Sequence, residues 1–327
     1  MRLEALNRRL EKIMPLITPT GVIIGVLLGS RISGFTYLSP WIFAFMTFAG
    51  SISSNFRDFF KVIKHPLPLI FCLTILHLVM PLIGMKMGHI LFDTDVYTIT
   101  GLILAMAIPT GISSFVWVSI YKGSGVLTLA IILLDTMLSP FIVPLTLSAL
   151  VGARVEMEVW PMMESLFLMI VLPSVLGMVL NEWTKGEIKK TWGPRLNPFS
   201  KIGMGLVVAI NGSVIAPYLK GVNGRLVEIA VVVMVLASIG YVIGWVVAKL
   251  MHWDDDIVVA VMFNSGMRNI STGAILAVTY FPPPVAVPVV LAMLFQQSLA
   301  ALFGHILNHF SERKKHLAGA EAEAEKK

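Results

Sequence analysis

The chain has 327 residues, of which 56% are hydrophobic and 13% are charged, and its formal net charge at pH 7 is +6. Because soluble domains carry roughly 25% charged residues, this composition excludes an ordinary soluble protein and indicates a polytopic membrane protein. The single cysteine, Cys72, excludes a disulfide framework and a cysteine-based metal site.

Apolar stretches long enough to cross a bilayer recur along the chain. A helix needs about 20 apolar residues to span the hydrocarbon, and this criterion predicts about ten spanning helices with short connections. The predicted spans cover residues 14–30, 37–53, 67–91, 97–121, 125–151, 159–183, 199–219, 226–251, 256–280 and 285–310. The expected fold class is therefore an all-α polytopic membrane protein.

The two ends of the chain are polar. Residues 1–13 mix Glu4 and Glu11 with basic residues, and they resemble an amphipathic helix on the membrane surface more than a cleaved signal. Residues 311–327 form a second polar piece, whose end, from Gly319, is low in complexity and is expected to be disordered or a frayed helix.

The distribution of lysine and arginine predicts the orientation. Most of these residues lie at the span ends on the side of both termini, and few lie opposite: Arg31, Lys86, Arg154, Lys220 and Arg225. Since cytoplasmic loops are rich in basic residues, we expect a multi-pass protein of the cell (inner) membrane with both termini in the cytoplasm. The positive charge is then a signal of topology, and no nucleic-acid partner is expected.

Two of the predicted spans contain a polar interruption with a glycine. Residues 109–114 read Pro-Thr-Gly-Ile-Ser-Ser in the fourth span, and residues 264–269 read Asn-Ser-Gly-Met-Arg-Asn in the ninth. A broken helix in hydrocarbon needs a protein-lined or wet cavity for its freed backbone groups. Paired broken spans indicate the substrate site of a secondary transporter.

The positions of the interruptions divide the chain into two halves of five spans. An odd number of spans makes the second half inverted relative to the first, so we expect repeats at 14–153, with a break near 109–115, and at 154–310, with a break near 264–269. The breaks should cross near the bilayer midplane and present the positive ends of half-helices to an anion. The residues expected to bind substrate or ion there are Pro109, Gly111, Ser113, Ser114, Phe115, Asn264, Ser265, Gly266, Arg268 and Asn269, with Thr128 and Asn211 as possible lining residues.

Several short patterns, in their order and spacing, resemble the bile acid:sodium symporter family. They are residues 45–50 (Phe-Met-Thr-Phe-Ala-Gly), Phe56, residues 61–66 (Lys-Val-Ile-Lys-His-Pro), Pro109 with Gly111, Ser139 with Pro140, and Gly266 with Asn269. The resemblance covers about residues 15–310. It implies ten spans in two inverted repeats, a core domain with crossing broken helices, a smaller panel domain, and transport of an organic anion such as a steroid conjugate or a pantoate-like acid.

The sequence departs from this family where the family binds sodium. The resemblance implies oxygen ligands at five places that here hold Asn264, Arg268, Phe115, Ile132 and His77, while Ser114, Asn269 and Thr128 keep polar side chains. A guanidinium repels a cation, and phenylalanine and isoleucine offer no oxygen. Sodium is therefore doubted as a bound ion, and no cofactor is expected.

Three ionisable residues lie within the predicted core: His77 in the third span, Asp135 in the fifth and Arg268 in the ninth. A charge inside a span is expensive. We expect Arg268 to take the place of a sodium ion with Asp135 as its buried counter-ion, and His77 or Asp135 to be sensitive to protons. In the alternatives, Arg268 and Asp135 only hold two helices in register, His77 donates to a backbone carbonyl, or Arg268 grips a substrate carboxylate or sulfonate directly.

The function predicted is secondary active transport of a small organic anion by alternating access, either coupled to protons or independent of ions. One alternative is a sodium-coupled symporter with rearranged ion sites. Another is a membrane prenyltransferase-like enzyme, because residues 254–256 (Asp-Asp-Asp) could bind magnesium. This cluster stands alone at a helix start, where acidic residues suit the helix dipole, so the protein is not expected to be an enzyme.

Overall fold

The computed structural model describes residues 2–54, 66–152, 155, 157–219 and 224–324, and every regular element within these residues is a helix. Five described helices are long and apolar enough to cross a membrane by length and composition: Pro66–Phe92, Gly125–Val151, Val159–Trp183, Gly224–Leu250 and Pro283–His309. Shorter apolar helices cover Leu16–Leu28 and Val96–Ala107. The prediction of an all-helical polytopic membrane protein is confirmed.

The other predicted spans are shorter or more polar helices. The fourth span is divided into α7 (Val96–Ala107) and α8 (Ser113–Ile120), and the ninth into α16 (Asp255–Gly266) and α17 (Ile270–Tyr280). The second span is the short helix α3 (Ser39–Ser51). The seventh lies in α13 (Gly193–Val214), whose first half carries polar residues.

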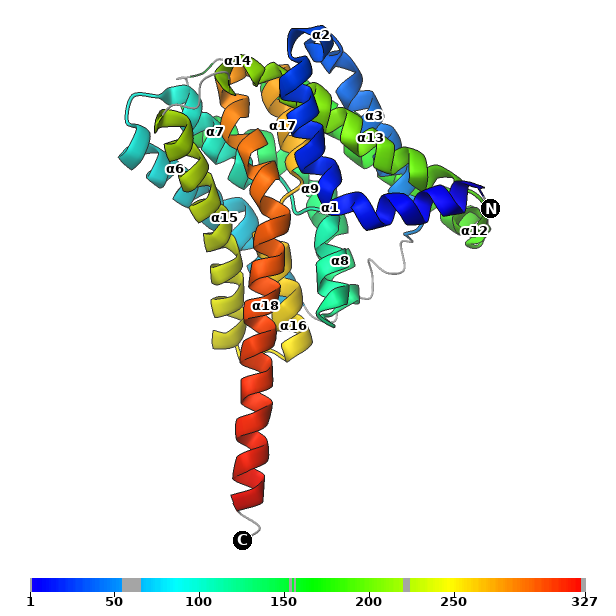
Figure 1. The fold of residues 1–327 in the computed structure, drawn as a ribbon, viewed down its shortest axis with the longest axis vertical. Helices are drawn as coiled ribbons and strands as arrows, with labels where there is room; N and C mark the ends of the chain where they lie inside the picture. Colours follow the sequence, from blue (N-terminus) through cyan, green and yellow to red (C-terminus); the bar gives the residue numbers. More distant parts are fainter. Residues whose placement is uncertain (1, 55–65, 153–154, 156, 220–223, 325–327) are drawn as a thin grey trace.

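One group of helices packs around α3 and α13, and we call it the panel. It comprises α1 (Arg2–Leu28), α3, α10 (Val159–Leu166), the π-helix η5 (Phe167–Val171), α11 (Leu172–Trp183) and α13. α1 runs along α13, and its Gly21 and Gly25 let the two backbones approach closely. α1 also bends along its length (Figure 1); Pro15 and Pro19 lie within it, and each removes a backbone donor.

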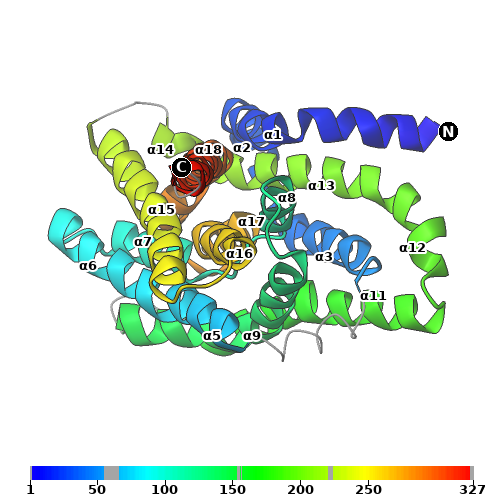
Figure 2. The same cartoon turned by 90° about the horizontal axis from the view of Figure 1, so that it is seen from below.

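The remaining long helices form a second group, the core, which surrounds the broken spans. It comprises α5 (Pro66–Thr74), the π-helix η3 (Ile75–Val79), α6 (Met80–Phe92), α7, α8, α9 (Gly125–Val151), α15 (Gly224–Leu250), α16, α17 and α18 (Ala286–Ala324). Figure 2 shows α16 and α17 in the middle of this group, with α15, α5, α9, α8 and α18 around them.

The panel contacts the core through particular elements. α17 packs against α13, α3 and the short 3-10 helix η1 (Thr36–Leu38), and α10 packs against α9, whereas α8 packs against α9 and α16 within the core. Short helices complete the connections: α2 (Ser30–Ser33), α12 (Glu187–Thr191), α14 (Ala216–Leu219) and the 3-10 helix η6 (Pro283–Val285). The two groups agree with the core and panel that the family resemblance implies.

The C-terminal tail is described by the structure, whereas the expected boundary between the repeats is not. α18 continues as a helix to Ala324, which agrees with the helical one of the two alternatives expected for the tail, because alanine, glutamate and lysine have high helix propensity. The expected boundary between the repeats, at residues 153 and 154, lies outside the described residues, as do the family patterns at Phe56 and 61–65. The division into repeats therefore stays a prediction.

Candidate functional site

The first break separates α7 from α8. α7 ends at Ala107, and Ile108 is extended (ψ 150°) while its N–H still donates to Leu104 O at 3.2 Å. Pro109 follows, and a proline both lacks an N–H and disfavours helical conformation in the residue before it. α8 begins at Ser113. The interruption predicted from the sequence is therefore present.

The second break ends a helix in the same way without a proline. α16 ends at Gly266, and Met267 is extended (φ −95°, ψ 140°) while its N–H donates to Phe263 O at 2.9 Å. Asn269 is the N-cap of α17, where its side chain accepts from Thr272 N. A Cβ added at Gly266 would lie 2.3 Å from Cγ of Tyr241, so only glycine lets α15 pack against this break.

The two breaks touch each other through their backbones. Asn269 N donates to Pro109 O at 2.8 Å. The Thr110 hydroxyl donates to Asn264 O at 3.0 Å and to Met267 O at 3.2 Å. A Cβ added at Gly111 would lie 2.8 Å from Arg268 O, so a glycine is required where the breaks cross. The crossing expected from the two polar interruptions is therefore a direct contact.

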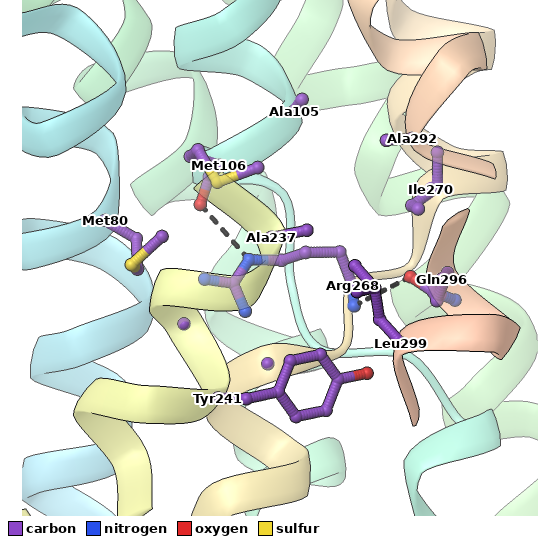
Figure 3. A pocket seen from close by; sticks show the side chains of 12 residues that line it. Met80, Ala105, Met106, Ala237, Tyr241, Arg268, Ile270, Ala292, Gln296 and Leu299 are labelled. Atoms are coloured by element: carbon purple, nitrogen blue, oxygen red, sulfur yellow. Dashed lines mark hydrogen bonds between the residues drawn. The ribbon is translucent and has the colours of Figure 1, made fainter. Parts of the chain in front are cut away.

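The Arg268 side chain lies at the carboxyl ends of both half-helices (Figure 3). It is 4% exposed, and its Nη1 donates to Ser265 O at 2.7 Å and to Met267 O at 3.4 Å, while its Nε donates to Met106 O at 3.3 Å. Met106 belongs to the last turn of α7 and Ser265 to the last turn of α16, whose carbonyls have no partner within their own helices. The guanidinium thus places a positive charge where both helix dipoles are negative.

The expected counter-ion of Arg268, Asp135, makes no direct ion pair with it. Asp135 is fully buried, and its carboxylate lies 2.5 Å from His77 Nε2 and accepts from Thr110 N at 2.6 Å. The break frees the Thr110 N–H, so the Asp135 carboxylate has two partners: this N–H in the first break and the imidazole of His77 on η3. Among the described residues no ion pair reaches Arg268 within 4.0 Å, although the charge of Asp135 still acts on it through space. The alternative in which His77 donates to a backbone carbonyl is wrong.

A second network joins three of the predicted site residues beside the crossing. The Ser114 hydroxyl donates to Asn264 Oδ1 at 2.9 Å, and Asn264 Nδ2 donates to Thr128 Oγ1 at 3.1 Å and to Ala260 O at 2.8 Å. All three side chains are buried. Their oxygens already take part in hydrogen bonds with one another, and an amide nitrogen lies among them. This donor set does not fit a sodium ion, which needs several free oxygen ligands.

The other predicted residues lie around this centre. Ser113 is half-buried at the start of α8. Phe115 lies two residues further along α8 and packs beside Gly125 at the start of α9. Ser265 contributes its carbonyl to Arg268, and its hydroxyl lies 3.5 Å from Cys72 Sγ. Asn211 lies in the panel, where it accepts from Ser39 Oγ at 3.1 Å, and this bond does not involve the crossing.

Sequence reasoning missed two residues at the centre. Thr110 joins the two breaks, and Gln296 on α18 accepts from Arg268 N at 3.1 Å. Thr110 could have been found, because a hydroxyl inside a broken helix is well placed to satisfy freed carbonyls. A hydrogen bond of Gln296 across the core is expected from a polar residue inside a span and is present, but no pattern in the sequence assigned it to the site, since polar residues at helix contacts are common in membranes.

A small cavity lies next to the guanidinium (Figure 3). It is lined by the second break, with Arg268, and by residues of α6, α7, α15, α16, α17 and α18, among them Met80, Tyr241 and Gln296. The cavity volume is about 10 Å³, which is room for about one water molecule. An organic anion is much larger, so this conformation does not hold one in the cavity.

Two broken helices that cross inside a helical membrane core define the class of protein, a membrane transporter. The family model described as the Sodium Bile acid symporter family matches residues 40–221, more than half of the chain. The chain belongs to this family. The resemblance seen in the sequence is thereby confirmed, and membership of a transporter family agrees with the expectation that the protein is not an enzyme.

Several curated proteins are similar over most of the chain. The uncharacterized protein YbaS of Bacillus subtilis (strain 168) is 52% identical over 297 residues, which cover 91% of this chain and 97% of the relative. The uncharacterized sodium-dependent transporter YocS of the same organism is 27% identical over 82% of this chain and 83% of the relative. The probable chloroplastic sodium/metabolite cotransporter BASS2 of Oryza sativa subsp. japonica is 25% identical over 85% of this chain and 67% of the relative.

Proposed function

We propose that the protein is a secondary active transporter that carries a small organic anion by alternating access and does not require sodium. The observation that carries this proposal is the position of the Arg268 guanidinium on carbonyl oxygens of α7 and α16. In transporters with broken helices, unwound carbonyls and the carboxyl ends of half-helices coordinate the coupling cation. Arg268 supplies a permanent cation at that place.

The network around Asn264 supports the same conclusion. A sodium ion between Ser114 and Thr128 would need lone pairs directed at it, but the Asn264 amide donates to Thr128 and the Ser114 hydroxyl donates to Asn264. Phe115 and Ile132, which replace oxygen ligands implied by the family resemblance, cannot contribute. Both places where a sodium ion would be expected thus hold protein groups that donate hydrogen bonds.

The amino ends of α8 and α17 are the proposed site for the anionic group of the substrate. Helix amino ends carry partial positive charge and free N–H groups. Ser113 and Asn269, at these two ends, are half-buried, so both can reach a ligand. Ile112, Val116 and Ile120 form an exposed apolar face on α8 that suits the apolar body of an organic acid. Arg268 acts from the opposite helix ends and is not proposed to grip the substrate.

The way the two groups contact each other supports alternating access. The panel packs against α17, whereas α8 packs against α9 and α16 in the core. A movement of the panel relative to the core can therefore uncover the amino end of α17 and cover that of α8. We place both termini on the cytoplasmic side of the cell membrane because the basic residues gather at the span ends on their side.

The test is uptake by the full-length protein in liposomes that contain no sodium. Pyruvate, pantoate and the bile-acid conjugate taurocholate serve as probe anions, because they span small carboxylates and a bulky sulfonate. We expect at least one of them to enter at the same rate whether the salt outside is sodium or potassium. Strict dependence on sodium would overturn the proposal in favour of a sodium-coupled symporter with rearranged ion sites, and no uptake of any probe would remove the organic anion.

A further inference from the structure

His77 and Asp135 form a buried titratable pair that the proposed sodium-free mechanism does not use. His77 lies in the π-helix η3, and its Nε2 is 2.5 Å from Asp135 Oδ1 on α9; the side chains are 8% and 0% exposed. A carboxylate that accepts from Nε2 selects the neutral tautomer with its hydrogen on that nitrogen. The free lone pair of the imidazole is then on Nδ1.

His77 Nδ1 is buried and has no hydrogen-bond partner among the described residues. A buried acceptor without a donor is unfavourable, and this nitrogen is also the position at which the ring accepts a proton. Protonation converts the hydrogen bond between a neutral imidazole and the carboxylate into an ion pair between an imidazolium and the carboxylate. His77 is thus in a position to bind one proton and remain paired.

The pair is connected directly to the crossing. Asp135 Oδ2 accepts from Thr110 N, and the Thr110 hydroxyl donates to the carbonyls of Asn264 and Met267 in the other break. The amino end of α8 begins two residues beyond Gly111, which follows Thr110. The carboxylate is therefore close to the proposed anion site in sequence and in space, and its negative charge opposes an anion there.

The buried charges around the crossing sum to zero in two states, one without an anion and one with an anion and a proton bound together. Arg268 contributes one positive charge and Asp135 one negative charge; Cys72 on α5 and Tyr241 on α15 are the other titratable groups near them, and neither a thiol nor a phenol is charged at neutral pH. With neutral His77 the sum is zero. A bound monoanion makes it negative, and a proton on His77 restores zero.

From this balance we infer that His77 binds the coupling ion: one proton is carried with each monovalent organic anion, and transport is electroneutral. The inference rests on the proposed function, because it assumes an anion at the crossing. Binding is reciprocal, so the anion raises the proton affinity of the pair by the factor by which the proton raises anion affinity. Sodium has no part in the cycle.

The experiment uses the full-length protein and the same three probe anions. Thermal stability of the purified protein first identifies which probe binds, and uptake of that probe into sodium-free liposomes is then measured. A pH-sensitive dye in weakly buffered solution counts protons taken up on binding. Taurocholate is the most informative probe, because a sulfonate does not itself take up a proton near neutral pH.

We expect one proton to be taken up per anion bound, and accumulation of about tenfold per unit of pH gradient that does not change with membrane potential. His77→Gln keeps a donor for Asp135 but cannot titrate, and it should bind the probe without proton uptake and lose accumulation driven by the pH gradient. His89→Gln, the same change on α6, is the matched control, and it should behave as the unmodified protein.

Each failure has a different meaning. If a probe is transported but its accumulation follows membrane potential and ignores pH, or if His77→Gln still accumulates it with the pH gradient, the proton inference is wrong and the proposed function stands. If no probe binds or enters, both fail. Should His77→Gln not fold, the proton count on the unmodified protein decides, since binding without proton uptake overturns the inference.

Discussion

The two breaks end their helices in the same way but satisfy their backbones differently. In each, the residue after the half-helix is extended and its N–H donates four residues back, from Ile108 to Leu104 and from Met267 to Phe263. The first break contains no charged residue, and side chains from other segments satisfy its backbone: Asp135 accepts from Thr110 N, and Arg268 donates to Met106 O. The second break supplies Arg268 itself.

This difference indicates that the two breaks have different roles. The break of the ninth span holds the permanent charge that stabilises the carboxyl ends of both half-helices. The break of the fourth span, through Thr110, connects the crossing to Asp135 and His77. Variants that affect one break and not the other can therefore separate stability from the proposed proton coupling.

The largest effect is expected from Arg268→Met, which removes the charge shared by the two breaks. The carbonyls of Met106, Ser265 and Met267 lose a donor, and each carbonyl left unpaired costs about 1–3 kcal/mol. We expect a large fall in the thermal unfolding temperature and loss of anion uptake. Arg31→Met, at an exposed position on α2, is the control and should change neither. Normal uptake by Arg268→Met would contradict the assigned role.

A smaller loss is expected from Gly266→Ala, which strains the second break alone. The new methyl group would lie about 2.3–2.5 Å from the Tyr241 ring, and that ring is stacked on Phe303 at 4.7 Å and cannot easily move away. Overpacking of this kind costs about 1–3 kcal/mol. Gly50→Ala on α3 meets no atom within 4 Å and is the control. Equal unfolding temperatures for the two variants would show that this break is not tightly packed.

Arg268→Gln sharpens the comparison by making the second break resemble a sodium site. The neutral amide leaves the carbonyls short of donors and the charge of Asp135 without compensation, and a small cation is a suitable ligand for both. We therefore expect sodium, but not potassium, to raise the unfolding temperature of this variant. The unmodified protein should show no such difference, and a variant indifferent to both ions would weaken the idea that Arg268 occupies a cation position.

The smallest effect is expected far from the breaks, where Arg225 on α15 contacts Asp95 at 3.2 Å before α7. Partial burial alone would raise the pKa of Asp95, but hydrogen bonds from Thr98 and the charge of Arg225 outweigh it and hold the pKa below its usual value. A lowered pKa means that this stabilisation is present above the ordinary aspartate pKa and is lost as the pH falls through the lowered one. Arg225→Gln should therefore destabilise slightly, by about 0.2–1 kcal/mol.

The control for Arg225→Gln is to repeat the measurement of the unfolding temperature at acid pH. The difference in unfolding temperature between the variant and the unmodified protein should shrink in acid, once Asp95 is protonated. Arg225 also pairs with Glu228 at 3.1 Å and lies 4.4 Å from the centroid of the Phe92 ring. The contact with the ring does not depend on pH and contributes to the difference that remains in acid. A difference that grows in acid would contradict the direction of the pKa shift.

Much of the fold could be predicted from the sequence because its signals are local. Apolar runs place the helices, and Pro109, Gly111 and Gly266 stand out within them as breaks. The partner of Asp135 could not be predicted, because it depends on how η3, α9 and the first break are rotated against one another. The sequence marked Arg268 as important, but only packing shows that it caps helices instead of pairing with a carboxylate.

Direct binding of radioactive sodium to the purified protein tests the central claim most directly. If Arg268 and Asn264 occupy the two cation positions, the unmodified protein should bind no sodium that excess unlabelled sodium displaces, while Arg268→Gln should bind it. Saturable binding of sodium by the unmodified protein, displaced by sodium and not by potassium, would contradict the account.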